Sequence, residues 1–284
     1  MRARAFGGGG PAVPVVGQGT WDVPTSGAAR DDAVRALREG IELGMVHVDT
    51  AEMYGNGRAE EVVGEAIAGL PRERLFLVSK VLPENATFEG TQRACERSLR
   101  RMGTDYLDCY LLHWRGAHPL EGTMRALERL VDDGKIRSLG VSNFDVADLE
   151  EAAGLVRSHP IACNQVLYNL TERGIERRVL PYCARNGIAL VGYSPFGQGG
   201  FPSPASAGGR ALAAIAARHD DGPYAVALAF LVRLAGTFAI PKAARPAHVR
   251  ENARGAALTL AERDLADLEA AFPLPATDGP LATA

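Results

Sequence analysis

The chain has 284 residues, 46% of them hydrophobic, which is enough for one large core or two small ones. Its 31 Lys and Arg residues nearly balance its 34 Asp and Glu residues, and the net charge of -3 offers no attraction for a polyanion. We therefore expect no nucleic-acid partner.

The spacing of the cysteines and the length of the apolar runs indicate the cellular compartment in which the protein works. Four cysteines occur singly, with no C-x-x-C pair and no His-rich neighbourhood, so neither a disulfide framework nor a bound metal is expected. No apolar run reaches the about 18 residues of a membrane span. The N-terminal "MRARAFGGGGPAVP" lacks the apolar core of a signal peptide. These features predict a cytoplasmic protein without membrane contact.

Short apolar, β-rich runs alternate with longer stretches of helical period along the whole chain. Strands are predicted at residues 14–17, 45–50, 75–80, 107–113, 136–142, 162–168, 189–195 and 238–242. Helical patterns lie between them, and several end in glycine. Eight such units predict an α/β fold in the form of a (β/α)8 TIM barrel, with an open doubly wound sheet as the alternative.

The last interval between predicted strands is longer than the others. It holds "GGRALAAIAARH" and "PYAVALAFLVRLAG", which predict two helices, and "GQGGFPSPASAGG", which predicts a loop over the barrel mouth. We expect two extra helices on the barrel and no domain boundary, so that residues 1–284 form a single domain.

The ends of the predicted strands carry polar side chains at nearly every position. They are Asp49, Lys80, His113, Ser142 with Asn143, Gln165, Tyr193 and Lys242. Barrel enzymes gather their chemistry at the C-terminal ends of the strands, so these side chains are candidates for an active site at that mouth.

Three of these candidates, Asp49, Lys80 and His113, form a set with Tyr54, which follows Asp49 by five residues. Alone, Asp49 could cap a helix, Lys80 could be a solvated charge, and His113 could be a satisfied core histidine. In a barrel, however, Asp49 would supply the counter-charge that a buried Lys80 needs, and the ammonium would lower the pKa of Tyr54. His113 could hydrogen-bond the same oxygen as Tyr54.

Eight sequence blocks resemble those of the aldo/keto reductase family, in the family's order and spacing. They are "GQGTW", "DTAEMYGNG", "LVSKV", "YLLHW", "GKIRSLGVSNF", "NQVLYNL", "YSPFGQGG" and "IPKAARPAHVRENA". The resemblance covers essentially the whole chain, and it is nearest to the bacterial methylglyoxal-reductase-like branch.

The resemblance implies a catalytic tetrad and a cofactor. Tyr54 would be the general acid, Lys80 would tune it, Asp49 would hold Lys80, and His113 would orient the carbonyl. A nicotinamide cofactor would lie across the barrel mouth, with NADP(H) preferred and NAD(H) possible. Neither "GGGGPAVP" nor "GQGGFPSP" opens a helix, so a Rossmann phosphate turn is not expected.

The resemblance assigns residues to the nicotinamide, pyrophosphate and adenosine parts of the cofactor, and three more to the cofactor as a whole. Ser142, Asn143 and Gln165 would bind the nicotinamide carboxamide, Tyr193 would stack on its ring, and Ser194, Pro195, Phe196 and Gly197 would lead into the loop over the pyrophosphate. At the adenosine end the family pattern places Lys242, Arg245, His248, Glu251 and Asn252. Gly19, Thr20 and Asp49 complete the set.

The substrate pocket would be formed by Trp21, Tyr54, His113 and Trp114 in the family pattern. The tail "FPLPATDGPLATA" is short and rich in small residues, so we expect it to leave the mouth open. Small aldehydes, dicarbonyls or ketones are the expected substrates.

Two functions from different classes remain open. The first is an NADPH-dependent reductase that converts carbonyls to alcohols by hydride transfer, with Tyr54 as proton donor. The second is a nicotinamide-nucleotide-binding regulatory subunit with little turnover. The complete acid–base set favours the enzyme. A metal-dependent hydrolase is disfavoured because the six histidines show no ligand spacing. The expected partner is a small carbonyl compound, and we expect a monomer.

Overall fold

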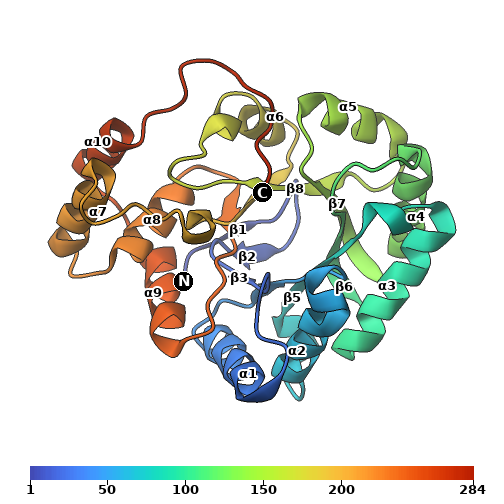
Figure 1. The fold of residues 1–284 in the computed structure, drawn as a ribbon. Helices are drawn as coiled ribbons and strands as arrows, with labels where there is room; N and C mark the ends of the chain where they lie inside the picture. Colours follow the sequence, from blue (N-terminus) through green and yellow to red (C-terminus); the bar gives the residue numbers. More distant parts are fainter.

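Eight parallel strands form a barrel that is surrounded by helices (Figure 1) in the computed structural model, which describes residues 1–284. The strands lie side by side in chain order: β3 (Gln18–Gly19), β4 (His47–Asp49), β5 (Phe76–Val81), β6 (Leu107–Leu112), β7 (Ile136–Ser142), β8 (Ile161–Leu167), β9 (Ala189–Tyr193) and β10 (Thr237–Ala239). All eight strands are buried or nearly so, as expected for a parallel sheet that is covered on both faces.

A seam between the first and last strands closes the barrel. The Gly17 amide donates to the carbonyl of Ala239 at 2.8 Å, the Ala239 amide donates to Val15 at 2.9 Å, and the Gly19 amide donates to Pro241 at 3.0 Å. A Cβ on Gly19 would lie 2.5 Å from the carbonyl oxygen of Ile240, so this close approach requires glycine. The closed (β/α)8 barrel is confirmed, and the open sheet is excluded.

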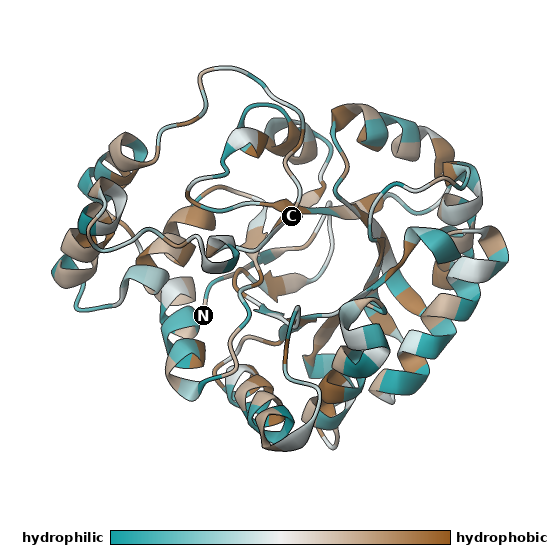
Figure 2. Cartoon of the chain, viewed as in Figure 1, coloured by the Kyte–Doolittle hydropathy of each residue, from teal (hydrophilic) through white to brown (hydrophobic).

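Ten helices pack outside the strands. They are α1 (Gly27–Glu42), α2 (Arg58–Ile67), α3 (Phe88–Met102), α4 (Leu120–Asp132), α5 (Val146–Leu155), α6 (Val179–Arg185), α7 (Ala207–Arg218), α8 (Pro223–Leu231), α9 (Pro246–Ala257) and α10 (Glu262–Ala271). Eight units require eight helices, so two are additional. Helices α7 and α10 pack against each other through Leu212, Ile215 and Leu268, and they lie together at one side of the ring in Figure 1. Figure 2 shows both hydrophobic and hydrophilic residues along the helices, as expected for helices that bury one face only.

An N-terminal hairpin, which was not predicted from the sequence, covers one end of the barrel. Strand β1 (Ala3–Ala5) pairs antiparallel with β2 (Ala12–Pro14). The segment predicted as a strand at residues 14–17 leads from this hairpin into the first barrel strand, β3, and Val15 and Gly17 already pair with Ala239 in the seam. The glycine run forms the turn, where Gly7 and Gly9 have positive φ angles of 78° and 84°. Phe6 is buried below the turn against the rings of Phe76 and Phe238, at 4.6 and 5.2 Å.

Residues 273–284, here called the C-terminal tail, contain no helix or strand. They run from α10 over the top of the molecule to the barrel centre, as the red segment in Figure 1 shows. None of the ten helices is both long enough and apolar enough to cross a membrane. No group of three or more His, Cys, Asp and Glu side chains is arranged to hold a metal ion.

Candidate active site

Three neighbouring strands bring the predicted catalytic set together at one end of the barrel. Asp49 ends β4, Lys80 lies near the end of β5, and His113 directly follows β6. Tyr54 begins a single 3-10 turn, η1 (Tyr54–Gly57), five residues after Asp49. Because β4, β5 and β6 are adjacent and parallel, their C-terminal ends meet at the same rim.

Lys80 is fully buried and is held by three oxygen atoms. Its Nζ donates to Asp49 Oδ1 at 2.5 Å, to the carbonyl oxygen of Thr50 at 2.8 Å and to the hydroxyl of Tyr54 at 3.3 Å. Gln165, on β8, donates its amide to the other oxygen of Asp49 at 2.7 Å. The buried charges are therefore paired and hydrogen-bonded, which is the condition for keeping them inside a protein.

Burial and pairing act on this ion pair in different directions. Burial alone would lower the pKa of Lys80, but the neighbouring Asp49 carboxylate and Tyr54 hydroxyl outweigh it and raise that pKa above its ordinary value. Lys80 therefore stays protonated at neutral pH. Burial raises the pKa of Asp49, and the charge of Lys80 and the amide of Gln165 oppose this effect.

Tyr54 is a protonated phenol. Burial raises its pKa more than the Lys80 ammonium lowers it, and Asp49 adds to the increase. The interpretation that Lys80 brings the pKa of Tyr54 toward neutrality is therefore wrong for the unliganded chain, because Tyr54 is only 8% exposed and its desolvation dominates. The hydroxyl retains a proton to donate and has a cation 3.3 Å away to stabilise the phenolate left behind.

His113 is a neutral imidazole beside Tyr54. Burial, and then the positive charge of Lys80, lower its pKa to about 2. Its ring stands edge-on to that of Tyr54 with centroids 5.7 Å apart, and its Nδ1 has no hydrogen-bond partner. Only one of the two ring nitrogens of a neutral imidazole carries a hydrogen. His113 can therefore donate one hydrogen bond without carrying a charge.

A cavity of about 160 Å³ opens in front of these groups. Three of the four catalytic candidates, all but the fully buried Lys80, line it together with the residues predicted for nicotinamide and substrate: Gly19, Thr20, Trp21, Asp49, Tyr54, His113, Trp114, Ser142, Asn143, Gln165, Tyr193 and Ser194. Trp21 packs edge-on against Tyr54, with ring centroids 5.0 Å apart. One cavity therefore brings the expected hydride, proton and substrate sites into contact.

Amide and phenol groups form another part of the cavity wall. Tyr193 donates its hydroxyl to Asn143 Oδ1 at 2.8 Å, and the Asn143 amide donates to the carbonyl oxygen of His113 at 3.1 Å. Asn143 has a φ of 61°, a left-handed conformation that costs energy for a residue other than glycine. Such strain is common at ligand sites, where surrounding contacts hold it in place.

The other predicted cofactor residues lie outside this cavity. Phe196 packs its ring against Phe201 and Tyr224, at 5.8 and 4.8 Å, and Pro195, Phe196 and Gly197 line a separate small pocket in the chain after β9. Lys242, Arg245, His248, Glu251 and Asn252 lie in the segment from the end of β10 into α9. Lys242, Arg245 and His248 are exposed, whereas Glu251 accepts a hydrogen bond from the amide of Tyr224 at 3.2 Å.

Four further residues line the cavity and were missed from the sequence: Met53, Gln198, Ile240 and Ala284. Met53 and Gln198 lie inside recognised blocks, so their neighbours could have indicated them. Ala284 carried no such signal. The prediction that the tail leaves the mouth open is wrong, because the amide of Ala284 donates to the hydroxyl of Tyr193 at 3.3 Å.

A closed parallel barrel with a tyrosine hydroxyl beside a buried Lys–Asp pair at its mouth is the arrangement of a barrel enzyme. The sequence profile described as "Aldo/keto reductase family" matches residues 15–272. The chain therefore belongs to the aldo/keto reductase family, as the sequence predicts.

The relatives agree with this assignment over nearly the whole chain. Methylglyoxal reductase YeaE of Escherichia coli is 47% identical over 264 residues, 93% of each chain, and glyoxal reductase of Bacillus subtilis is 35% identical over 92% of this chain and 90% of its own. The crystal structure of an aldo/keto reductase from Klebsiella pneumoniae in complex with NADP and acetate is 43% identical, covers 100% of both chains and superposes with a TM-score of 0.93. These relatives also confirm the predicted methylglyoxal-reductase-like branch.

Proposed function

We propose that the protein reduces the carbonyl group of small aldehydes and dicarbonyls to alcohols with NADPH, and that Tyr54 supplies the proton. The observation that carries the proposal is the contact between Lys80 and the hydroxyl of Tyr54, at 3.3 Å, within a cavity that also holds the predicted nicotinamide residues. The relatives named above support the reaction class, since two of them are a methylglyoxal reductase and a glyoxal reductase.

The residues present fit a nicotinamide cofactor. Ser142, Asn143 and Gln165 offer hydroxyl and amide groups on the cavity wall, and Tyr193 presents a ring that its hydrogen bond to Asn143 fixes in place. When bound, NADPH supplies a hydride for the carbonyl carbon. An NADP-bound and an NADPH-bound neighbour, both 43% identical, support the preference for the phosphorylated form.

The adenosine end would be held by the segment from β10 into α9. Lys242 and Arg245 are exposed cations without an ion-pair partner. Arg245 is also the residue before α9, whose N-terminus carries no side-chain cap. The helix dipole at such an end favours an anion. We assign the 2'-phosphate to Lys242, with Arg245 as a second contact.

Each catalytic side chain then has one role. Tyr54 donates its proton to the carbonyl oxygen, and Lys80 stabilises the phenolate that remains. Asp49 keeps Lys80 charged and in place. His113, as a neutral imidazole with a pKa of about 2, donates a hydrogen bond to the same oxygen and so orients the substrate.

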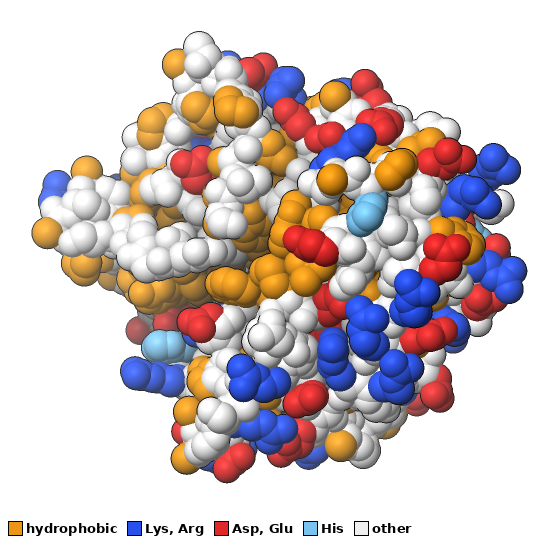
Figure 3. Space-filling model, turned by 45° about the vertical axis from the view of Figure 1, so that its right-hand side comes forward, with side chains coloured by type: hydrophobic (Ala, Val, Ile, Leu, Met, Phe, Trp, Pro, Cys, Tyr) orange, Lys and Arg blue, Asp and Glu red, His pale blue; other side chains and the backbone are white.

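The cavity walls argue for small substrates. Trp21, Trp114 and Met53 offer flat and flexible apolar surfaces, while Ala284 narrows the opening. Dicarbonyls and simple aromatic aldehydes should therefore react faster than steroid ketones. We place the enzyme in the cytoplasm, where its four free cysteines would remain reduced. Figure 3 shows basic and acidic side chains side by side on one face, and we propose a monomer that binds no nucleic acid.

A substrate panel followed by the loss of NADPH absorbance tests this function. Methylglyoxal, glyoxal and benzaldehyde should be turned over by the unsubstituted protein, and the Tyr54→Phe variant serves as the control for background reaction. Turnover of none of them, together with tight NADPH binding, would favour the regulatory-subunit alternative. A steroid with the highest kcat/KM would contradict the substrate class.

A further inference from the structure

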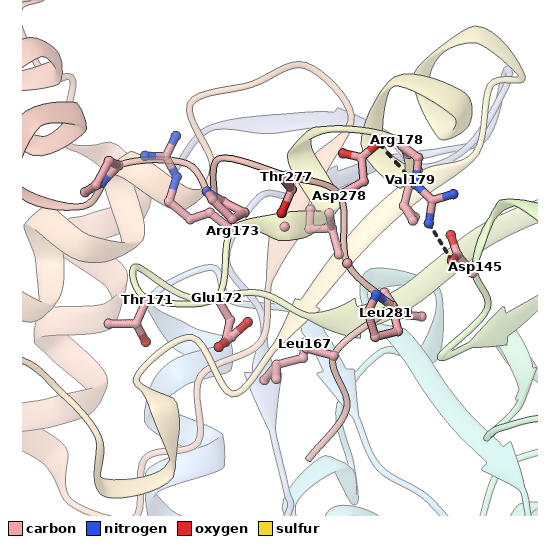
Figure 4. Close-up of a pocket in the computed structure, with 17 residues that line it drawn as sticks. Asp145, Leu167, Thr171, Glu172, Arg173, Arg178, Val179, Thr277, Asp278 and Leu281 are labelled. Atoms are coloured by element: carbon pink, nitrogen blue, oxygen red, sulfur yellow. Dashed lines mark hydrogen bonds and ion pairs between the residues drawn. The ribbon is translucent and has the colours of Figure 1, made fainter.

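A second cavity, of about 420 Å³, lies beneath the C-terminal tail and outside the active site. Its walls are the tail, the chain segment from Thr171 to Val179 that follows β8, and Asp145 at the start of α5. Figure 4 shows Asp278 of the tail above this space and Arg178 between Asp278 and Asp145. The tail therefore bridges the cavity instead of packing down into it.

Two consecutive arginines hold the middle of the tail. Arg177 donates its Nε to Asp278 Oδ1 at 2.8 Å and its Nη2 to the carbonyl oxygen of Ala276 at 3.0 Å. Arg178 approaches the other oxygen of Asp278 at 3.9 Å. The tail has no helix or strand of its own, and most of its residues are exposed. Its position depends on this small number of contacts.

Arg178 also contacts the segment that carries Asn143. It donates to Asp145 Oδ2 at 2.9 Å, as one dashed line in Figure 4 shows. Asp145 uses its other oxygen to cap α5, where it accepts from the amide of Val146 at 2.7 Å. Asp145 is only two residues beyond Asn143, whose φ of 61° needs support from neighbouring contacts. Arg178 therefore fixes the chain immediately after the strained residue.

The end of the tail reaches the same residue by a second route. The amide of Ala284 donates to the hydroxyl of Tyr193 at 3.3 Å, and that hydroxyl donates to Asn143 Oδ1 at 2.8 Å. The route from Asp278 through Arg178 and Asp145 and the route from Ala284 through Tyr193 both end at Asn143. The tail thus supports Asn143 in two ways: through the side chain of Asn143, which binds Tyr193, and through the backbone segment after Asn143, which Asp145 anchors.

We propose that Asp278 and Arg178 are positioning residues for the nicotinamide half of the cofactor, acting through the tail on Asn143 and Tyr193. This inference rests on the proposed function, in which these two residues receive the nicotinamide ring. A released tail would leave Tyr193 with one hydrogen bond instead of two and α5 with a less constrained cap. The adenosine half, on the segment from β10 into α9, would be unaffected.

The test compares two ligands that share the adenosine with its 2'-phosphate, of which only one carries a nicotinamide. Isothermal titration of the Asp278→Asn variant with NADPH and with adenosine 2',5'-bisphosphate separates the nicotinamide contribution from that of adenosine and phosphate. Because exposed ion pairs are weak, the expected effect is NADPH binding that is about two- to fivefold weaker, with unchanged bisphosphate binding. Arg178→Gln breaks the contacts to both Asp278 and Asp145, and it should weaken NADPH binding further.

Two controls separate positioning from general destabilisation. Asp267→Asn removes an ion pair to Arg218 of the same length, 2.8 Å, and similar exposure, and it should leave both affinities unchanged. Asp278→Glu keeps the charge and should retain most of the NADPH affinity. Equal losses for the two ligands, or no loss for either, would overturn the inference. If the unsubstituted protein bound the bisphosphate and NADPH equally well, the nicotinamide site of the proposed function would fail as well.

Discussion

The ammonium group of Lys80 lies 2.5 Å from a carboxylate oxygen of Asp49, and neither side chain is more than 1% exposed. Adjacent parallel strands place the two charges side by side, and Gln165 reaches across from β8 to bind the remaining carboxylate oxygen. The proposed proton donor, Tyr54, therefore faces a cation that is paired and shielded from water.

Removing the cation should damage both folding and catalysis. Lys80→Met leaves the Asp49 carboxylate buried without its partner, so we expect the free energy of unfolding to fall by about 3–5 kcal/mol. The double variant Asp49→Asn, Lys80→Met should recover much of that stability, because it removes the other charge, but it should not recover turnover. Urea unfolding and NADPH oxidation measure the two effects. A double variant no more stable than the single one would contradict this account.

Loss of the phenol should affect turnover and spare cofactor binding. Tyr54→Phe keeps the ring packed against Trp21 and His113 but removes the proton, so kcat should fall by about 10²- to 10⁴-fold. The Kd for NADPH should change little. Because burial raises the pKa of Tyr54 above its ordinary 10, reduction by the unsubstituted protein should not lose its proton donor below that pH. Turnover near the wild-type rate in Tyr54→Phe would rule out this donor.

The choice of cofactor should depend on an exposed lysine. Lys242→Ala removes one charge-assisted contact to the 2'-phosphate, so NADPH should bind about ten- to a hundredfold more weakly, while NADH, which lacks that phosphate, should be unaffected. The Kd values of both cofactors for both proteins provide the measurement. Arg245→Ala should cause a smaller change in the same direction. Equal affinity of the unsubstituted protein for the two cofactors would show that Lys242 has no phosphate to bind.

Acid should destabilise the protein through a histidine at the far end of the barrel. His47 is fully buried, neither ring nitrogen has a partner, and burial, then the charge of Lys80, lowers its pKa from 6.5 to about 3. Below pH 6.5 His47 is protonated in the unfolded chain but stays neutral in the folded chain, so the free energy of unfolding falls as the pH falls. Near pH 5 the loss from this group approaches about 2 kcal/mol.

A variant without the titrating group tests that effect. His47→Phe should lose less stability than the unsubstituted protein between pH 7.5 and pH 5, as measured by urea unfolding at each pH. His113 still contributes in both proteins, because its pKa is lowered as well. Parallel pH dependences for the two proteins would show that His47 is not the residue that responds to acid.

Strand order predicts that three of the four proposed catalytic residues meet, and Tyr54 follows one of them, Asp49, by only five residues. Asp49, Lys80 and His113 each end an apolar run, and consecutive parallel strands necessarily bring such ends to one rim. The balance of charge around Tyr54 could not be predicted in the same way. The sequence indicates which charged residues neighbour Tyr54. The extent of its burial decides the direction of the pKa shift, and that burial depends on residues from distant parts of the chain, such as Trp21.

The N-terminal hairpin was missed, and the course of the tail was wrongly predicted, for a related reason. Neither segment shows a helical or strand period, since β1 and β2 have three residues each and the tail has no regular structure. Their positions come from single contacts to residues far away in the sequence, such as Phe6 with Phe76 and Asp278 with Arg177. Contacts of this kind leave no periodic pattern in the chain.

The order of the functional groups along the chain has a consequence for synthesis. The acid–base set is complete by His113, whereas most of the groups proposed for the cofactor lie from Ser142 onward, and Gln165 binds Asp49 only after β8 exists. A nascent chain that has left the ribosome as far as α4 therefore contains Lys80 and Asp49 before the amide partner and the rest of the barrel have been made. Two fragments separated between α4 and β7 would place the proposed proton donor in one fragment and most of the proposed cofactor residues in the other, and neither fragment alone would be a reductase.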